Sequence, residues 1–158
     1  MAAVRFILTC LMLLSLRALG RDVDPLWDND SLLPLENQVI KITGEMYDEM
    51  ITSRYPGKPL NSVPWVLLFV GHYPTLDEAK YKMALDILAR DYQGLVRFGW
   101  VDFNEEELLA ATFEAMYIPQ VFLIKDGWVH WYRDLPDASY VRNYIESERY
   151  KTSTTIFQ

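Results

Sequence analysis

The segment from Met116 to Arg133 constrains the fold of this chain more than any other. Gln120 to Ile124 form an unbroken run of β-forming residues, and Asp126-Gly127 follows as a strong signal for a tight hairpin. Trp128 to Arg133 then reads as the returning strand. Ile118-Pro119 stands directly before the first strand, where a proline can begin a strand without removing a ladder hydrogen bond. The segment therefore predicts an antiparallel hairpin that begins at a proline.

The residues on either side of this hairpin predict alternating strands and helices. Trp65 to Val70 is a continuous apolar run, as expected of a strand buried on both faces. Further strands are expected at Gln38–Thr43 and Val96–Phe103, and helices at Gly44–Ile51, at 76–92, from Asn104 onward, and from Asp137 to about Arg149.

Two helix starts carry capping signals. Thr75 with Glu78 forms a capping box, in which each residue's side chain accepts from the other's backbone N–H. Asn104 with Glu107 repeats the pattern at the next helix. Three- and four-residue spacing predicts the buried faces of the helices. The expected core residues are Leu76, Ala79, Met83, Ile87 and Leu88, then Leu108, Leu109, Thr112, Phe113 and Met116, then Tyr140, Val141, Tyr144 and Ile145.

A helix ending in Phe113-x-x-x-x-Ile118-Pro119, an apolar strand, Lys-Asp-Gly and a second strand together resemble the second half of a thioredoxin-fold domain. The similarity to the thioredoxin-like and protein disulfide isomerase-related family extends over roughly Gln38 to Arg149. The resemblance implies an α/β thioredoxin fold, with a central mixed sheet of about five strands flanked by about four helices. It also implies that the Ile118-Pro119 bond is cis and that its loop faces the position of the family's redox dithiol.

The chemistry of that family does not transfer to this chain. The resemblance places Thr75 and Glu78 where redox-active relatives carry two cysteines, whereas the only cysteine here is Cys10. Disulfide exchange needs a thiolate, so we expect a redox-inactive member that is not an enzyme. Thr75 as a nucleophile would need His72 as its base, and a helix cap is the expected role instead. His72 and His130 lack the spacing of metal ligands, so neither a metal nor a cofactor is expected.

Residues 1–20 read as a secretory signal peptide. Arg5 precedes an apolar run from Phe6 to Leu16, and small residues up to Gly20 supply a cleavage site. The alternative is a signal anchor, but the run is shorter than the ~20 apolar residues that a membrane span needs. We therefore expect cleavage after Gly20, loss of Cys10, and a mature protein in the endoplasmic reticulum lumen or secreted.

The remaining chain divides into an extended acidic lead-in at 21–37, the domain at 38–149 and a polar tail at 150–158. Asn29-Asp30-Ser31 in the lead-in is a sequon for glycosylation at Asn29. The net charge of −7 argues against nucleic acid and anionic membrane as partners. After the leader, no apolar run is long enough to cross a membrane.

Two functional hypotheses from different classes follow. In the family that this chain resembles, backbone atoms beside the cis-proline pair with an extended peptide, which implies a chaperone-like or adaptor module that binds a protein or peptide client. The residues of that groove would be His72, Tyr73, Thr75, Tyr117, Ile118 and Pro119. Alternatively, Pro119 only shapes the start of the strand. The chain would then be an N-terminal luminal structural module, or a short isoform, of a larger membrane-anchored protein, with contacts around Trp27, Trp128 or Trp131. The client and the oligomeric state stay open.

Overall fold

The computed structural model describes residues 37–48, 63–73, 75–126, 128–152 and 155–156. The expected signal peptide, the lead-in with Asn29, and Trp27 lie outside the described residues. No helix in the described ranges has the length and apolar character needed to span a bilayer.

The fold is built on a mixed sheet with the strand order β1-β3-β2-β4-β5-β6. Strand β2 is central, because it pairs in parallel with β3 and antiparallel with β4. The β4–β5 pair is the predicted hairpin, with Val121 opposite Tyr132 and Lys125 opposite Trp128. The strands are β1 (Val39–Lys41), β2 (Trp65–Val70), β3 (Arg97–Asp102), β4 (Gln120–Lys125), β5 (Trp128–Tyr132) and β6 (Thr155–Ile156).

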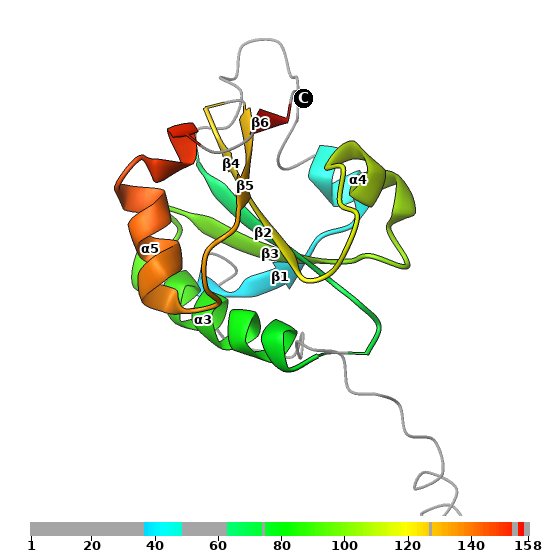
Figure 1. The fold of residues 1–158 in the computed structure, drawn as a ribbon, viewed down its shortest axis with the longest axis horizontal. Helices are drawn as coiled ribbons and strands as arrows, with labels where there is room; N and C mark the ends of the chain where they lie inside the picture. The colour runs from blue at the N-terminus through cyan, green and yellow to red at the C-terminus, as the bar shows by residue number, and fades with distance from the viewer. Residues whose placement is uncertain (1–36, 49–62, 74, 127, 153–154, 157–158) are drawn as a thin grey trace, which may run out of the picture.

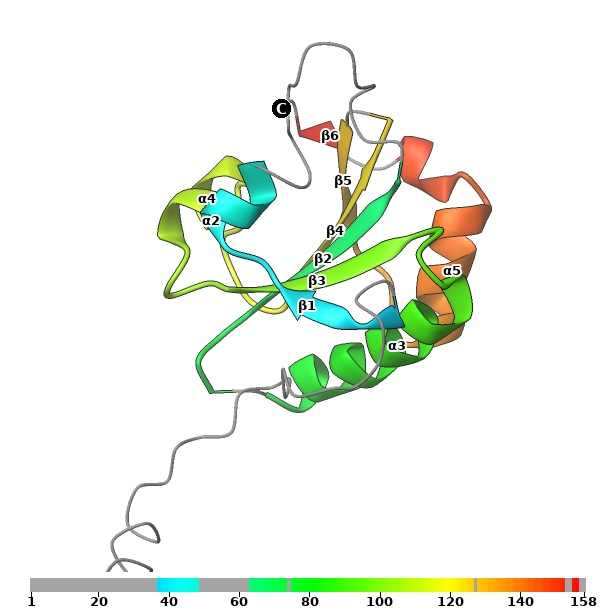
Figure 2. The same ribbon diagram turned by 180° about the vertical axis from the view of Figure 1, so that it is seen from behind.

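Helices cover both faces of this sheet. The α-helices are α2 (Gly44–Met46), α3 (Leu76–Tyr92), α4 (Glu107–Thr112) and α5 (Ala138–Glu146), and a short 3-10 helix, η3 (Arg149–Thr152), follows. Helices α3 and α5 lie together on one face, while α2 and α4 lie on the other (Figures 1 and 2). This is the α/β arrangement that the sequence predicted, and the central strands lie close to their expected bounds.

Each face of the sheet has its own apolar core. The core beneath α3 and α5 includes Leu68, Leu85, Leu88 and Tyr144, and the core beneath α2 and α4 includes Phe69, Phe113 and Phe122. Alternate residues of β2 point to opposite faces, which is why the whole strand is apolar and buried.

The predicted buried face of α3 was largely wrong. Leu76 and Met83 are 74% and 66% exposed, and Ile87 is exposed as well. Apolar residues are spread around this helix rather than confined to one side, so residue spacing alone did not identify the inward face. The side chains that pack inward are Glu78, Tyr81, Ala84, Leu85, Leu88 and Ala89. Glu78 and Tyr81 carry polar groups, so a prediction based on the spacing of apolar residues left them out.

The start of α4 also differs from its prediction. The helix begins at Glu107 with Glu106 at the cap position, so Asn104 is not its cap. The Asp102 carboxylate accepts from the N–H groups of Asn104 and Glu105, which forms a turn that delays the helix. The inward-facing residues are Leu109, Ala110 and Phe113. Three residues expected in the core, Leu108, Thr112 and Met116, are exposed.

The C-terminal residues are not simply a polar tail. Helix α5 ends at Glu146, earlier than expected, and Tyr140 on it is exposed, whereas Val141, Tyr144 and Ile145 are buried as predicted. Tyr150 is buried against α5 and the ring of His130. The two-residue strand β6 then pairs with β5, which adds a strand to the five that were expected.

Candidate functional site

The N-terminus of α3 holds Thr75 and Glu78, which the sequence resemblance assigned to the two cysteine positions of redox-active relatives. Thr75 is the N-cap, and its hydroxyl oxygen accepts from the Glu78 N–H at 3.3 Å. The Glu78 carboxylate accepts from the Thr75 N–H and, at 2.6 Å, from the Gly71 N–H. The Glu78 side chain is fully buried, and these bonds together with the positive end of the helix dipole compensate for its charge. The predicted capping box is therefore confirmed.

The loop of Tyr117, Ile118 and Pro119 leads into β4, and we call it the proline loop. The Ile118-Pro119 peptide bond is cis. The buried Gln120 side chain accepts from the N–H of Met116 at 2.9 Å and of Tyr117 at 3.3 Å. These two bonds hold the backbone of the loop in place. The N–H and C=O of Ile118 itself hydrogen-bond to no other residue that the structure describes. One donor and one acceptor are thus left unused just before the first residue pair of the β2–β4 ladder.

Gly71 brings the capping box and the proline loop together. A Cβ atom at Gly71 would lie 2.5 Å from Ile118 Cδ1 and 3.7 Å from Glu78 Oε1, so only glycine allows this approach without displacing the Ile118 side chain. His72 and Tyr73 follow on the turn into α3, where both are exposed and their rings meet edge to face at 4.9 Å. The six predicted groove residues therefore lie on two adjoining segments, and Ile118 contacts the segment that precedes α3.

Sequence reasoning missed an aromatic hollow beside the proline loop. Its volume is about 310 Å³, and it is lined by Tyr81, Tyr117, Pro119, Trp131, Tyr132 and Arg133. Tyr117 and Pro119 had been named as groove residues and Trp131 as a possible partner contact, whereas the other three had not been named. The hairpin register contained a signal for Tyr132 and Arg133, because pairing Val121 with Tyr132 brings the end of β5 beside Pro119.

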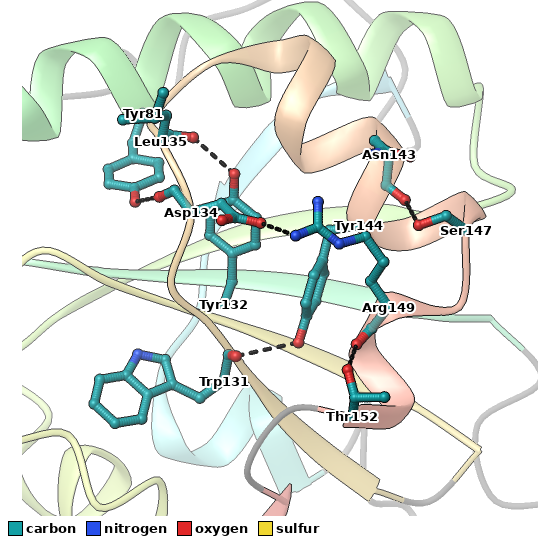
Figure 3. A network of polar contacts seen from close by, with 10 residues as sticks. All are labelled: Tyr81, Trp131, Tyr132, Asp134, Leu135, Asn143, Tyr144, Ser147, Arg149 and Thr152. Carbon is teal, nitrogen blue, oxygen red and sulfur yellow. Dashed lines mark hydrogen bonds and ion pairs between the residues drawn. The ribbon is translucent and has the colours of Figure 1, made fainter.

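Three tyrosine hydroxyls fix one wall of this hollow (Figure 3). They donate to three backbone carbonyls between Trp131, near the end of β5, and Leu135, just after it. The bonds run from Tyr144 to the Trp131 carbonyl at 3.1 Å, from Tyr81 to the Asp134 carbonyl at 3.1 Å, and from Tyr132 to the Leu135 carbonyl at 2.7 Å. Burial raises the pKa of Tyr81 to about 12 and raises the pKa of Tyr132 as well. Both phenols therefore stay protonated and keep donating across the physiological pH range.

The rim of the hollow combines an aromatic surface with a cation. The Arg133 guanidinium lies 3.6 Å from the centre of the Trp131 ring, and the Tyr117 ring lies 5.9 Å from that same ring. Trp131 is half-buried, whereas Trp128 at the hairpin is 42% exposed. Such a surface can hold apolar and aromatic groups and can pair with an anion.

Comparison with solved structures identifies the fold. Human ERp44 in a zinc-bound form is similar with a TM-score of 0.56 and 16% identity, over 70% of this chain and 32% of that chain. The J-Trx1 fragment of ERdj5 gives 0.57 and 14%, over 73% of this chain and 51% of that one. The short form of thioredoxin f from spinach chloroplast gives 0.59 and 16%, over 75% of this chain and 99% of that one.

The chain thus spans only a third to a half of the first two of these relatives and nearly all of the third. No protein-family model matches the sequence, and no curated protein matches it significantly. At these identities the likeness concerns the fold. The chain has the thioredoxin fold and, with Cys10 as its only cysteine, it has no dithiol active site.

Proposed function

We propose that this chain is a non-catalytic thioredoxin-like domain of the secretory pathway that binds an extended segment of a protein client at the proline loop. The apolar leader at residues 1–20 supports the secretory location. Lacking a thiolate after cleavage of that leader, the domain would hold its client without exchanging disulfides with it.

The observation that carries the proposal is the unused backbone of Ile118. Its N–H and C=O have no hydrogen-bond partner among the described residues, although the residues around them are held in place by Gln120. A fixed donor and acceptor at a strand end can take up a passing extended chain by strand addition, which uses no client side chain. The domain would therefore accept many client sequences.

The surface next to Ile118 suits this task. Gly71 contacts Ile118, and each of these residues has an exposed tyrosine close to it in the sequence. Tyr73 lies two residues after Gly71 and is 70% exposed, and Tyr117 lies directly before Ile118 and is 52% exposed. Aromatic side chains supply a large contact area at a small cost in conformational entropy. Client side chains on either side of Ile118 would thus meet aromatic rings.

The test uses protein purified after expression of the full chain in eukaryotic cells. The probe is a fluorescein-labelled heptapeptide of alternating valine and serine, blocked at both ends, and binding is followed by fluorescence anisotropy. We expect Tyr117→Ala and Ile118→Asp each to weaken binding by about tenfold, or on the order of 1–2 kcal/mol. Tyr117→Ala removes an aromatic contact, and Ile118→Asp replaces the side chain that packs against Gly71 and so displaces the Ile118 backbone.

Leu108→Asp is the matched control, because Leu108 is exposed on α4 and the substitution adds the same charge. Circular dichroism identifies any variant that fails to fold, and Tyr117→Ala is the decisive variant because its side chain is largely exposed. Peptide affinity that is the same in wild-type protein and in folded Tyr117→Ala and Ile118→Asp would refute the proposal.

A further inference from the structure

We propose that the bound client segment carries an acidic side chain, which enters the aromatic hollow and pairs with Arg133. This inference rests on the proposed function and names the chemistry of the client. It follows from three features of the hollow: an uncompensated cation, a fixed wall and a small volume.

Arg133 is the uncompensated cation. Its guanidinium stacks on Trp131, and it forms no ion pair or hydrogen bond with any residue in the described part of the chain. The neighbouring carboxylate of Asp134 is paired with Arg149 at 3.3 Å instead. Stacking uses the face of a guanidinium and leaves its N–H edge free, which is the edge that binds a carboxylate with two parallel hydrogen bonds.

An unpaired cation is unexpected on a protein with a net negative charge. The chain carries 22 acidic and 15 basic residues. Other basic side chains such as Lys82 and Arg142 pair with acidic neighbours. An exposed arginine without such a partner, set beside aromatic rings, is complementary to an anion supplied by another molecule.

The hollow is held in shape before any client arrives. The hydroxyls of Tyr81, Tyr132 and Tyr144 anchor the backbone on both sides of Arg133, through the carbonyls of Trp131, Asp134 and Leu135 (Figure 3). Binding to a fixed site loses less conformational entropy than binding to a mobile one. The segment that carries Arg133 is therefore preorganised.

The size and position of the hollow favour a side chain over a larger ligand. Its volume of about 310 Å³ is at the lower end of the range for small-molecule sites and accommodates one or two side chains. Pro119, which follows Ile118, lines the hollow. A client strand that pairs with Ile118 continues in both directions, so its C-terminal carboxylate lies away from the hollow. The anion that reaches Arg133 is therefore the side chain of an internal aspartate or glutamate.

The experiment extends the anisotropy assay with three blocked heptapeptides that differ only at the central residue, which is glutamate, glutamine or lysine. We expect the glutamate peptide to bind wild-type protein about tenfold more tightly than the glutamine peptide, and the lysine peptide to bind most weakly. Arg133→Gln should abolish this preference, and Arg133→Glu should reverse it toward lysine.

Arg90→Gln is the matched control, since Arg90 is exposed in the last turn of α3, about 13 Å along the helix axis from Tyr81. It lowers the net charge by the same amount and should leave the preference for glutamate unchanged. A glutamine peptide with a free C-terminus separates an internal side chain from a terminal carboxylate. If that peptide binds as tightly as the blocked glutamate peptide and depends on Arg133, an internal acidic side chain is the wrong assignment.

The two proposals fail in different ways. If all three peptides bind wild-type protein equally and Ile118→Asp weakens each of them, the inference about Arg133 is wrong and the proposed function stands. The inference about Arg133 is also wrong if Arg133→Gln weakens the three peptides equally, because Arg133 would then contribute packing alone. If neither Tyr117→Ala nor Ile118→Asp changes any of the affinities, both proposals are refuted.

Discussion

Replacing Glu78 by alanine tests the claim that a buried carboxylate stabilises the turn between β2 and α3. The substitution removes the acceptor of the Gly71 and Thr75 N–H groups. Hydrogen bonds to a charged group are worth roughly 1.5–3 kcal/mol each, and relief of the desolvation of a buried charge offsets part of that loss. We expect a net destabilisation of about 3 kcal/mol, or a melting temperature about 10 °C lower for a domain of this size. Thermal and urea unfolding followed by circular dichroism measure both quantities.

Two further variants make this prediction specific. Glu78→Gln keeps one acceptor oxygen without the charge, so it should lose about half as much stability. Glu107→Ala removes an exposed glutamate from the first turn of α4 and should change the free energy of unfolding by less than about 1 kcal/mol. The reasoning fails if Glu78→Ala unfolds at the same temperature as Glu107→Ala.

Gly99→Ala should destabilise the fold by about 1–3 kcal/mol in urea unfolding, because its Cβ would lie 2.9 Å from Leu67 Cδ2, and an unchanged midpoint would contradict this packing. Burial lowers the pKa of His130 in the folded protein. The stability that depends on a neutral His130 is therefore complete above the unfolded-state pKa of about 6.5 and is lost as the pH falls below it. His130→Leu should therefore lose less stability than wild type between pH 7.5 and 5, and equal losses would argue against this role. Thr75→Cys with Glu78→Cys should create a protein that reduces insulin disulfides, whereas wild-type protein does not, and an inactive double variant that still forms its disulfide would contradict the placement of the site.

The strands and the hairpin were predictable from the sequence because their signals are local and mutually consistent. The apolar run of β2, the Asp126-Gly127 turn and the Thr75–Glu78 cap each depend on residues within one element. The expected proximity of Thr75 to the proline loop did not come from local signals. It came from the family resemblance, which supplied the long-range contact between these two segments.

Other features depend on contacts that no local pattern encodes. The inward face of α3 includes Glu78 and Tyr81, whose polar atoms are satisfied by partners that lie seven or more residues away in the sequence. An apolar periodicity cannot count such residues, so it favoured the opposite face. Strand β6 has only two residues and forms by pairing with β5, which compensates for its weak local preference.

The aromatic hollow was missed for a related reason. Its lining comes from α3, the proline loop and β5, and its wall depends on a hydroxyl from α5. Each of these tyrosines reads in the sequence as ordinary core. Their common attachment to the carbonyls of Trp131, Asp134 and Leu135 becomes visible only when the three elements are placed together.

The most direct measurement of the central claim is hydrogen exchange at the Ile118 amide, with and without the blocked glutamate heptapeptide. Strand addition predicts that this amide, which has no partner among the described residues of the free protein, exchanges at least tenfold more slowly at saturating peptide. The hydrogen-bonded amides of Phe113 and Glu114 at the end of α4 serve as the internal reference and should not change. A saturated complex in which the Ile118 amide exchanges as fast as in the free protein would contradict the account.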